Sequence, residues 1–158
     1  MQQYNIHPIV MGTKVFDKGM MTYQYDYGKP YTIPIYSWYI EGGDKKILVD
    51  TGEMSPICSA EREKSINGKI YTFEEGLKRW GLCPQDIDII IHTHLHNDHC
   101  ENDYKCVNAT IYVHQKELDH IHITLIPWIF ATLRIILRMS RQIISSVLLI
   151  KIQRLCLG

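Results

Sequence analysis

The chain has 158 residues, enough for one domain with a hydrophobic core of its own. Acidic and basic residues are equal in number, at 17 each, and residues 1–119 contain no glycine-rich phosphate loop or basic patch, so nucleic-acid binding is not indicated. The amino terminus lacks the basic segment and apolar core of a secretory signal, and the five cysteines form no CxxC pair. A reduced, cytoplasmic protein is therefore expected.

The first predicted elements are two strands and a helix. Residues 33–41 and 45–50 have the composition of strands, and a glycine-rich turn joins them as in a hairpin. A helix is predicted between Thr72 and Gly81, where Thr72 and Glu75 have the spacing of a capping box. Its apolar stripe indicates packing against a core rather than a binding face, and consists of Phe73, Leu77 and Trp80.

Further strands follow this helix. Residues 87–92 and 110–113 are apolar runs typical of short buried strands, and a second helix is expected to open near Gln115. This order of strands and helices predicts an α/β protein with the layers of a sandwich. Four of the tyrosines that precede the first predicted strand are expected in core or rim packing, with a pocket wall as the alternative: Tyr23, Tyr25, Tyr27 and Tyr31.

The composition changes sharply after Asp119. Residues 1–119 carry a net charge of −5, whereas residues 120–158 carry +5, with five basic residues, no acidic residue and ten isoleucines. Residues 119–158 are therefore assigned to an atypical tail. A shifted reading frame or a truncated gene is the leading interpretation. A membrane-surface helix is the alternative, because Arg134, Arg138 and Arg141 have helical spacing. A membrane span is not expected, since no apolar run is long enough.

The sequence His94-Leu95-His96-Asn97-Asp98-His99 places three imidazoles and a carboxylate within six residues. These side chains are typical ligands of zinc and similar divalent metals, and their spacing indicates an irregular loop after the strand at 87–92. A solvated polar loop is the simpler alternative. His92, on the strand itself, is expected to be packed, and His114 is expected to make a local hydrogen bond.

This motif resembles the signature of the metallo-β-lactamase superfamily. The segment Ile47-Leu48-Val49-Asp50-Thr51-Gly52 resembles another motif of that superfamily, a strand that ends in Asp-Thr-Gly. Residues 34–41 and 92–100 resemble its N-acyl homoserine lactonase branch, and the resemblance extends over about residues 4–118. It implies a metallo-β-lactamase-like αββα layered sandwich, of which residues 1–118 form the first half only.

The resemblance also implies a dinuclear metal centre, usually containing zinc. His94 and His96 match ligands of the first ion, and Asp98 and His99 match ligands of the second, which makes Asp98 the expected catalytic residue. Asp50 matches a buried carboxylate that supports the ligand loop from behind. In the family, a hydroxide held by the two ions attacks the ester carbonyl of a small-molecule lactone.

One departure from the family concerns the remaining ligands. The family supplies further histidines and a bridging aspartate well downstream, whereas this chain has no Asp or Glu after Asp119. The expected function is therefore a zinc-dependent, lactonase-like hydrolase that is inactive as written. A hydrolase of the same fold acting on a thioester or another lactone is one alternative. The other is a non-catalytic remnant or a membrane-associated or interaction protein with a partial metal site.

Overall fold

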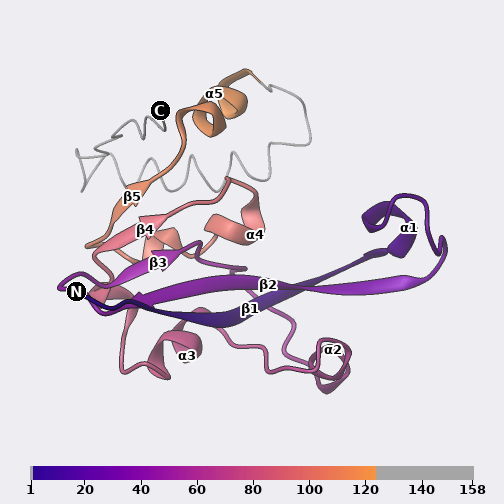
Figure 1. Cartoon of the computed structure of the whole chain (residues 1–158), viewed down its shortest axis with the longest axis horizontal. Helices are drawn as coiled ribbons and strands as arrows, with labels where there is room; N and C mark the ends of the chain where they lie inside the picture. Colours follow the sequence, from indigo (N-terminus) through magenta and orange to yellow (C-terminus); the bar gives the residue numbers. More distant parts are fainter. Residues whose placement is uncertain (1, 124–158) are drawn as a thin grey trace.

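The computed structural model describes residues 2–123, and side-chain environments up to residue 119. Five strands form one mixed sheet in the order β1-β2-β3-β4-β5, with helices between and after them (Figure 1). The elements are β1 (Asn5–Asp17), α1 (Lys18–Met21), β2 (Pro30–Glu41), β3 (Ile47–Val49), α2 (Ala60–Ser65), α3 (Phe73–Lys78), η1 (Pro84–Asp86), β4 (Ile89–Ile91), α4 (Asn97–Cys100), η2 (Asp103–Lys105), β5 (Thr110–Tyr112) and α5 (Gln115–Ile123).

The longest feature is the hairpin of β1 and β2, which extends far beyond the rest of the sheet in Figure 1. The two strands pair antiparallel from Asn5 opposite Glu41 to Asp17 opposite Pro30, with a bulge between Val10 and Thr13. The sequence did not predict β1, because the proline and glycine within it interrupt the alternating pattern. Its pairing with β2 supplies the ladder hydrogen bonds that local propensity does not indicate.

The tip of this hairpin carries the four tyrosines between residues 23 and 31. The expectation that they pack in a core or rim is wrong, because their exposed fractions run from 43 % for Tyr31 to 96 % for Tyr23. Lys18 and Lys29 each form an ion pair with Asp26, at 2.8 and 2.7 Å, which fixes the turn. The chain is therefore held at the tip by polar contacts, and the aromatic rings face solvent.

Helix α3 covers one face of the sheet. Its predicted capping box is confirmed: the Thr72 hydroxyl accepts from the Glu75 backbone N–H, and the Glu75 carboxylate accepts from the Thr72 N–H. Phe73 and Leu77 are fully buried in the main core together with Ile9 of β1. The apolar stripe thus packs against the hairpin, as its spacing predicts.

The strands beyond the hairpin have the expected order and nearly the expected bounds. β2 and β3 are antiparallel, whereas β3, β4 and β5 run parallel to one another. Parallel neighbours require a crossover, which α2 and α3 supply between β3 and β4. The carboxyl ends of β3 and β4 therefore lie side by side at one edge of the sheet.

Three further expectations concern the tail, membrane spanning and the cysteines. Of the basic, isoleucine-rich tail at 119–158, residues 124–158, which include the arginines at helical spacing, lie outside the described residues. Within residues 2–123, no helix combines the length and the apolar character that crossing a bilayer demands. The four cysteines in that range are free thiols, and burial raises the pKa of Cys100 and of Cys106 to about 12.

Candidate metal centre

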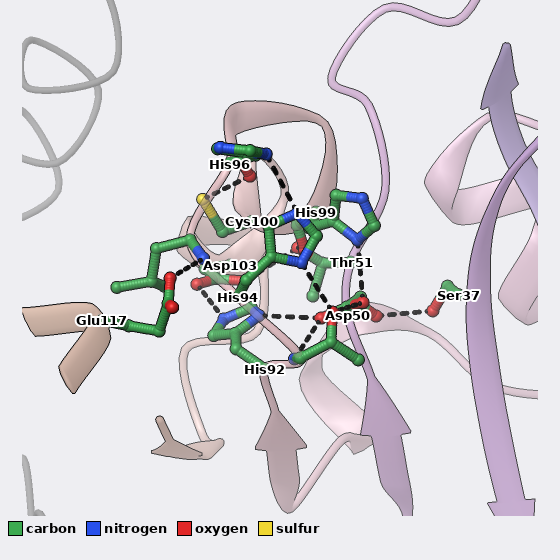
Figure 2. A network of polar contacts seen from close by, with 12 residues as sticks. Ser37, Asp50, Thr51, His92, His94, His96, His99, Cys100, Asp103 and Glu117 are labelled. Carbon is green, nitrogen blue, oxygen red and sulfur yellow. Dashed lines mark hydrogen bonds and ion pairs between the residues drawn. The ribbon is translucent and has the colours of Figure 1, made fainter. Parts of the chain in front are cut away.

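The predicted ligand motif lies at the shared carboxyl edge of β3 and β4. Asp50 directly follows β3, and residues 92–99 directly follow β4, so the parallel pairing brings the two segments together. The backbone N–H of Asp50 donates to the carbonyl oxygen of Ile91, at 3.0 Å, which continues the pairing past the strand ends. Figure 2 shows the resulting cluster of histidines above the Asp50 carboxylate.

The motif is only partly the irregular loop that its spacing predicted. His94 and His96 lie on a loop, but α4 begins at Asn97 and carries Asp98 and His99 on its first turn. The His99 backbone N–H donates to the His96 carbonyl oxygen, at 3.0 Å, which closes that turn. The loop prediction is therefore wrong for the last part of the motif, where backbone hydrogen bonding winds the chain into a short helix.

The three motif histidines lie in contact with one another. The His94 and His99 ring centroids are 4.0 Å apart, and His94 Nε2 lies 3.1 Å from His96 Nδ1. Partial burial lowers the pKa of His94, and the neighbouring imidazoles of His99 and His96 lower it further. The His94 ring is thereby favoured in its neutral form, which is the form that binds metal ions.

The Asp50 carboxylate supports this cluster from below. It is 2 % exposed, and it accepts hydrogen bonds from the Thr93 N–H (2.9 Å), the Thr93 hydroxyl (2.6 Å) and the His99 ring at Nδ1 (2.8 Å). Burial alone would raise the pKa of Asp50, but the hydrogen bonds from His92, His99 and Thr93 hold it well below its usual range. Asp50 is therefore an ionised carboxylate that orients His99.

The backbone around Asp50 is shaped for this role. Asp50 has a φ of 59°, in the left-handed region that aspartate tolerates better than most residues. Gly52 also has a positive φ, and a Cβ at this position would lie 2.5 Å from the Cβ of Met11. Only glycine fits there, which explains why the turn that presents Asp50 reads Asp-Thr-Gly.

The donor set fits a divalent metal ion. Because Asp50 occupies Nδ1 of His99, the Nε2 of that ring is left with its lone pair, as in the carboxylate–histidine arrangement of zinc proteins. Asp98 Oδ2 lies 4.0 Å from this Nε2. In the described residues, no group of three or more potential ligands already converges on one point. His94 Nε2 and His96 Nδ1 lie 3.1 Å apart, close to the separation of two nitrogen ligands on one tetrahedral zinc ion.

The structure also brings in residues that the motif did not predict. Glu117 of α5 accepts a hydrogen bond from the Leu95 N–H, at 3.1 Å, and so ties the loop to the last described helix. Asp103 of η2 contacts His92, whose predicted burial is confirmed at 5 % exposure. The predicted local bond of His114 is present too, since its Nδ1 accepts from the Lys116 N–H. No local sequence pattern indicates the Asp103 or Glu117 contacts, because both depend on tertiary packing.

A family model described as the metallo-beta-lactamase superfamily matches residues 31–123, more than half of the chain. The chain belongs to this superfamily. An N-acyl homoserine lactonase of Bacillus thuringiensis is 33 % identical over 107 residues, covering 58 % of this chain and 41 % of the lactonase. A probable metallo-hydrolase of Methanocaldococcus jannaschii is 51 % identical over 43 residues, or 27 % of this chain and 21 % of that protein. The chain thus spans less than half the length of these relatives.

Solved structures agree with the superfamily fold. An N-acyl homoserine lactone hydrolase with the product N-hexanoyl-L-homoserine at its catalytic metal centre superposes with a TM-score of 0.61 and 26 % identity, over 79 % of this chain and 54 % of that one. A probable metal-dependent hydrolase of Staphylococcus aureus gives 0.58 at 20 % identity, over 78 % and 51 %. The predicted α/β fold, the partial metallo-β-lactamase sandwich, is therefore confirmed. Membership of this superfamily implies use of a divalent metal, commonly zinc.

Proposed function

We propose that residues 31–123 supply the metal-binding half of a zinc-dependent hydrolase that opens the ring of a small N-acylated lactone. The proposal is supported by membership of the superfamily and by the similarity to N-acyl homoserine lactonases. The observation that carries it is the grouping of the motif histidines over the ionised Asp50 carboxylate. A buried carboxylate that hydrogen-bonds a histidine in this way fixes the orientation of the histidine as a metal ligand.

Each residue of the site has a role in this proposal. His94 and His96 would hold one ion, and Asp98 and His99 the other, while Asp50 keeps the His99 proton on Nδ1. Divalent ions held by these residues would lower the pKa of bound water towards neutrality and would stabilise negative charge on the substrate oxygen. Asp98 is only partly buried and, within the described part of the chain, makes no ion pair with Lys or Arg, so its carboxylate is accessible to a metal ion.

The test is an assay of lactone ring opening, followed by proton release, with added zinc and with a chelator. The 158-residue chain is expected to react no faster than a variant with His94→Ala and His96→Ala, because no carboxylate follows Asp119 to bridge two ions. A chain completed with a family-like second half is expected to gain chelator-sensitive turnover. That turnover is expected to disappear with Asp98→Asn.

Two outcomes would contradict the proposal. A completed chain that cleaves thioesters or other esters but leaves N-acylated lactones intact would show that the substrate class is wrong. Chelator-sensitive turnover by the unmodified chain, lost in the double alanine variant, would show that the site needs no bridging carboxylate. In that case His120 and His122 are the first residues to replace, since they are the only histidines after Asp119.

A non-catalytic protein with a partial metal site is the second candidate. Within the described residues no group of three or more potential ligands converges on one point, and this favours it, because a catalytic zinc normally has three protein ligands. This candidate predicts zinc binding without hydrolysis even in the completed chain. The same assay therefore separates the two functions.

A further inference from the structure

A buried ring of polar contacts lies beneath the motif histidines. His92 Nε2 lies 2.8 Å from Asp103 Oδ2, and His92 Nδ1 lies 3.4 Å from Asp50 Oδ1. The other oxygen of Asp103 accepts from the Thr51 hydroxyl, at 2.7 Å. Because Asp50 and Thr51 are neighbours in sequence, the contacts close into a ring of four residues, which Figure 2 shows below His94.

The members of this ring are almost completely shielded from solvent. The side chains of His92, Asp50 and Asp103 are 0 %, 3 % and 5 % exposed. A carboxylate can only accept hydrogen bonds, so both His92 nitrogens act as donors. The His92 imidazole therefore cannot rotate without losing both of its hydrogen-bond partners. Removing one partner from such a buried pair of charged groups carries a large free-energy cost, because the other charge is left buried and unpaired.

The ring leads directly to a motif histidine. Asp50 uses Oδ1 towards His92 and Oδ2 towards His99 Nδ1, at 2.8 Å, so fixing one oxygen also fixes the other. Thr51 reaches the same residue through the backbone, since its N–H donates to the His99 carbonyl oxygen at 2.7 Å. Asp103 therefore lies at the end of two chains of contacts that both finish at His99.

We propose that Asp103 is a positioning residue that acts through His92 and Asp50 to hold the His99 proton on Nδ1 and leave Nε2 free for a metal ion. The inference rests on the proposed function, in which His99 is a ligand. A free neutral imidazole favours the proton on Nε2, so the opposite tautomer must be imposed by the protein. An ionised acceptor at Nδ1 supplies that preference, since a charge-assisted hydrogen bond contributes about 1.5–3 kcal/mol.

The test uses the full chain without metal, labelled with 15N at its histidines, and reads the tautomer of His99 by NMR. The unmodified chain is expected to hold His99 with the proton on Nδ1, at about a tenfold preference. Asp103→Asn and His92→Asn are each expected to reduce that preference to a mixture. The double variant is expected to show the same His99 tautomer mixture as either single variant, because Asp103 and His92 act through the same series of contacts. Asp44→Asn, on an exposed turn, is the matched control.

Zinc affinity, measured by calorimetry, is the second readout. Each single variant is expected to lose about 10–100-fold in affinity, as supporting partners of metal ligands do, and Asp44→Asn is expected to lose none. If Asp103→Asn fails to fold, His92→Gln replaces it in both measurements. An unchanged His99 tautomer in a folded variant would overturn the inference and leave Asp103 a structural residue. If the variants change the His99 tautomer but the completed chain opens no lactone, the proposed function alone is overturned.

Discussion

At the scale of single residues, Asp50 determines most of the candidate site. One buried carboxylate accepts from Thr93, His92 and His99, and these contacts outweigh the cost of burying its charge. The Asp-Thr-Gly sequence acquires a physical meaning here: the aspartate accepts, the threonine binds Asp103, and the glycine allows the backbone to pass Met11. A substitution in this turn should therefore affect both folding and metal binding.

Replacing Asp50 with asparagine is expected to weaken both properties. An amide offers one acceptor oxygen and two donor hydrogens, so at least one of the Thr93, His92 and His99 donors would face another donor. Zinc affinity should fall about 10–100-fold, and the free energy of unfolding by roughly 1–3 kcal/mol. Calorimetry and urea titration measure the two effects, with Asp44→Asn as the exposed control. Unchanged zinc affinity in the Asp50 variant would contradict the role assigned to this carboxylate.

The full chain is expected to bind zinc weakly or substoichiometrically. The motif offers two ligands for each of two ions, whereas catalytic zinc normally has three protein ligands and a water. Solvent would have to complete each coordination shell. Calorimetry on the purified chain tests this expectation, and two tightly bound ions per chain would disprove it.

At the scale of elements, α3 shows how packing reverses a local preference. Gly76 lies in the middle of the helix, where alanine would normally be better by about 1 kcal/mol. A Cβ at this position, however, would lie 2.8 Å from both Ile9 Cγ2 and Met11 Cε. The helix sits so close to β1 that only glycine fits between them.

Gly76→Ala is therefore expected to destabilise the protein, by roughly 1–3 kcal/mol, in spite of its higher helix propensity. Gly68→Ala is the matched control, because a Cβ there would have its nearest neighbour at 3.7 Å and should change stability by less than about 0.5 kcal/mol. Urea unfolding of the two variants, followed by tryptophan fluorescence, checks the contrast. A Gly76 variant as stable as the parent would mean that β1 and α3 are less tightly packed.

At the scale of the whole molecule, the sheet has one well-covered face and one face with half-buried apolar side chains. On β2, fully buried residues alternate with residues of the opposite face that are only partly shielded, among them Tyr36, Trp38 and Ile40. Among residues 2–123, the edge strands of the sheet are β1 and β5. This arrangement matches a chain that spans about half of the lactone hydrolase structure.

A fragment of residues 1–119 is expected to fold poorly. Its exposed sheet face and open edge favour aggregation, or a broad unfolding transition with weak near-ultraviolet circular dichroism. Thermal melting followed by circular dichroism, together with light scattering, measures both features. A sharp, cooperative transition of a monomeric fragment would contradict this expectation.

The sequence by itself determined the features that depend on neighbouring residues. The capping box at Thr72, the strand before the motif and the density of ligands between His94 and His99 are local patterns, and the structure contains each of these elements. Only the tertiary structure decided which distant residues meet. β1 depends on its pairing with β2, and Asp103 reaches His92 and Thr51 only because parallel β3 and β4 end at one edge. Periodicity encodes which face of an element is apolar, whereas the register between elements is set by packing across the whole sheet.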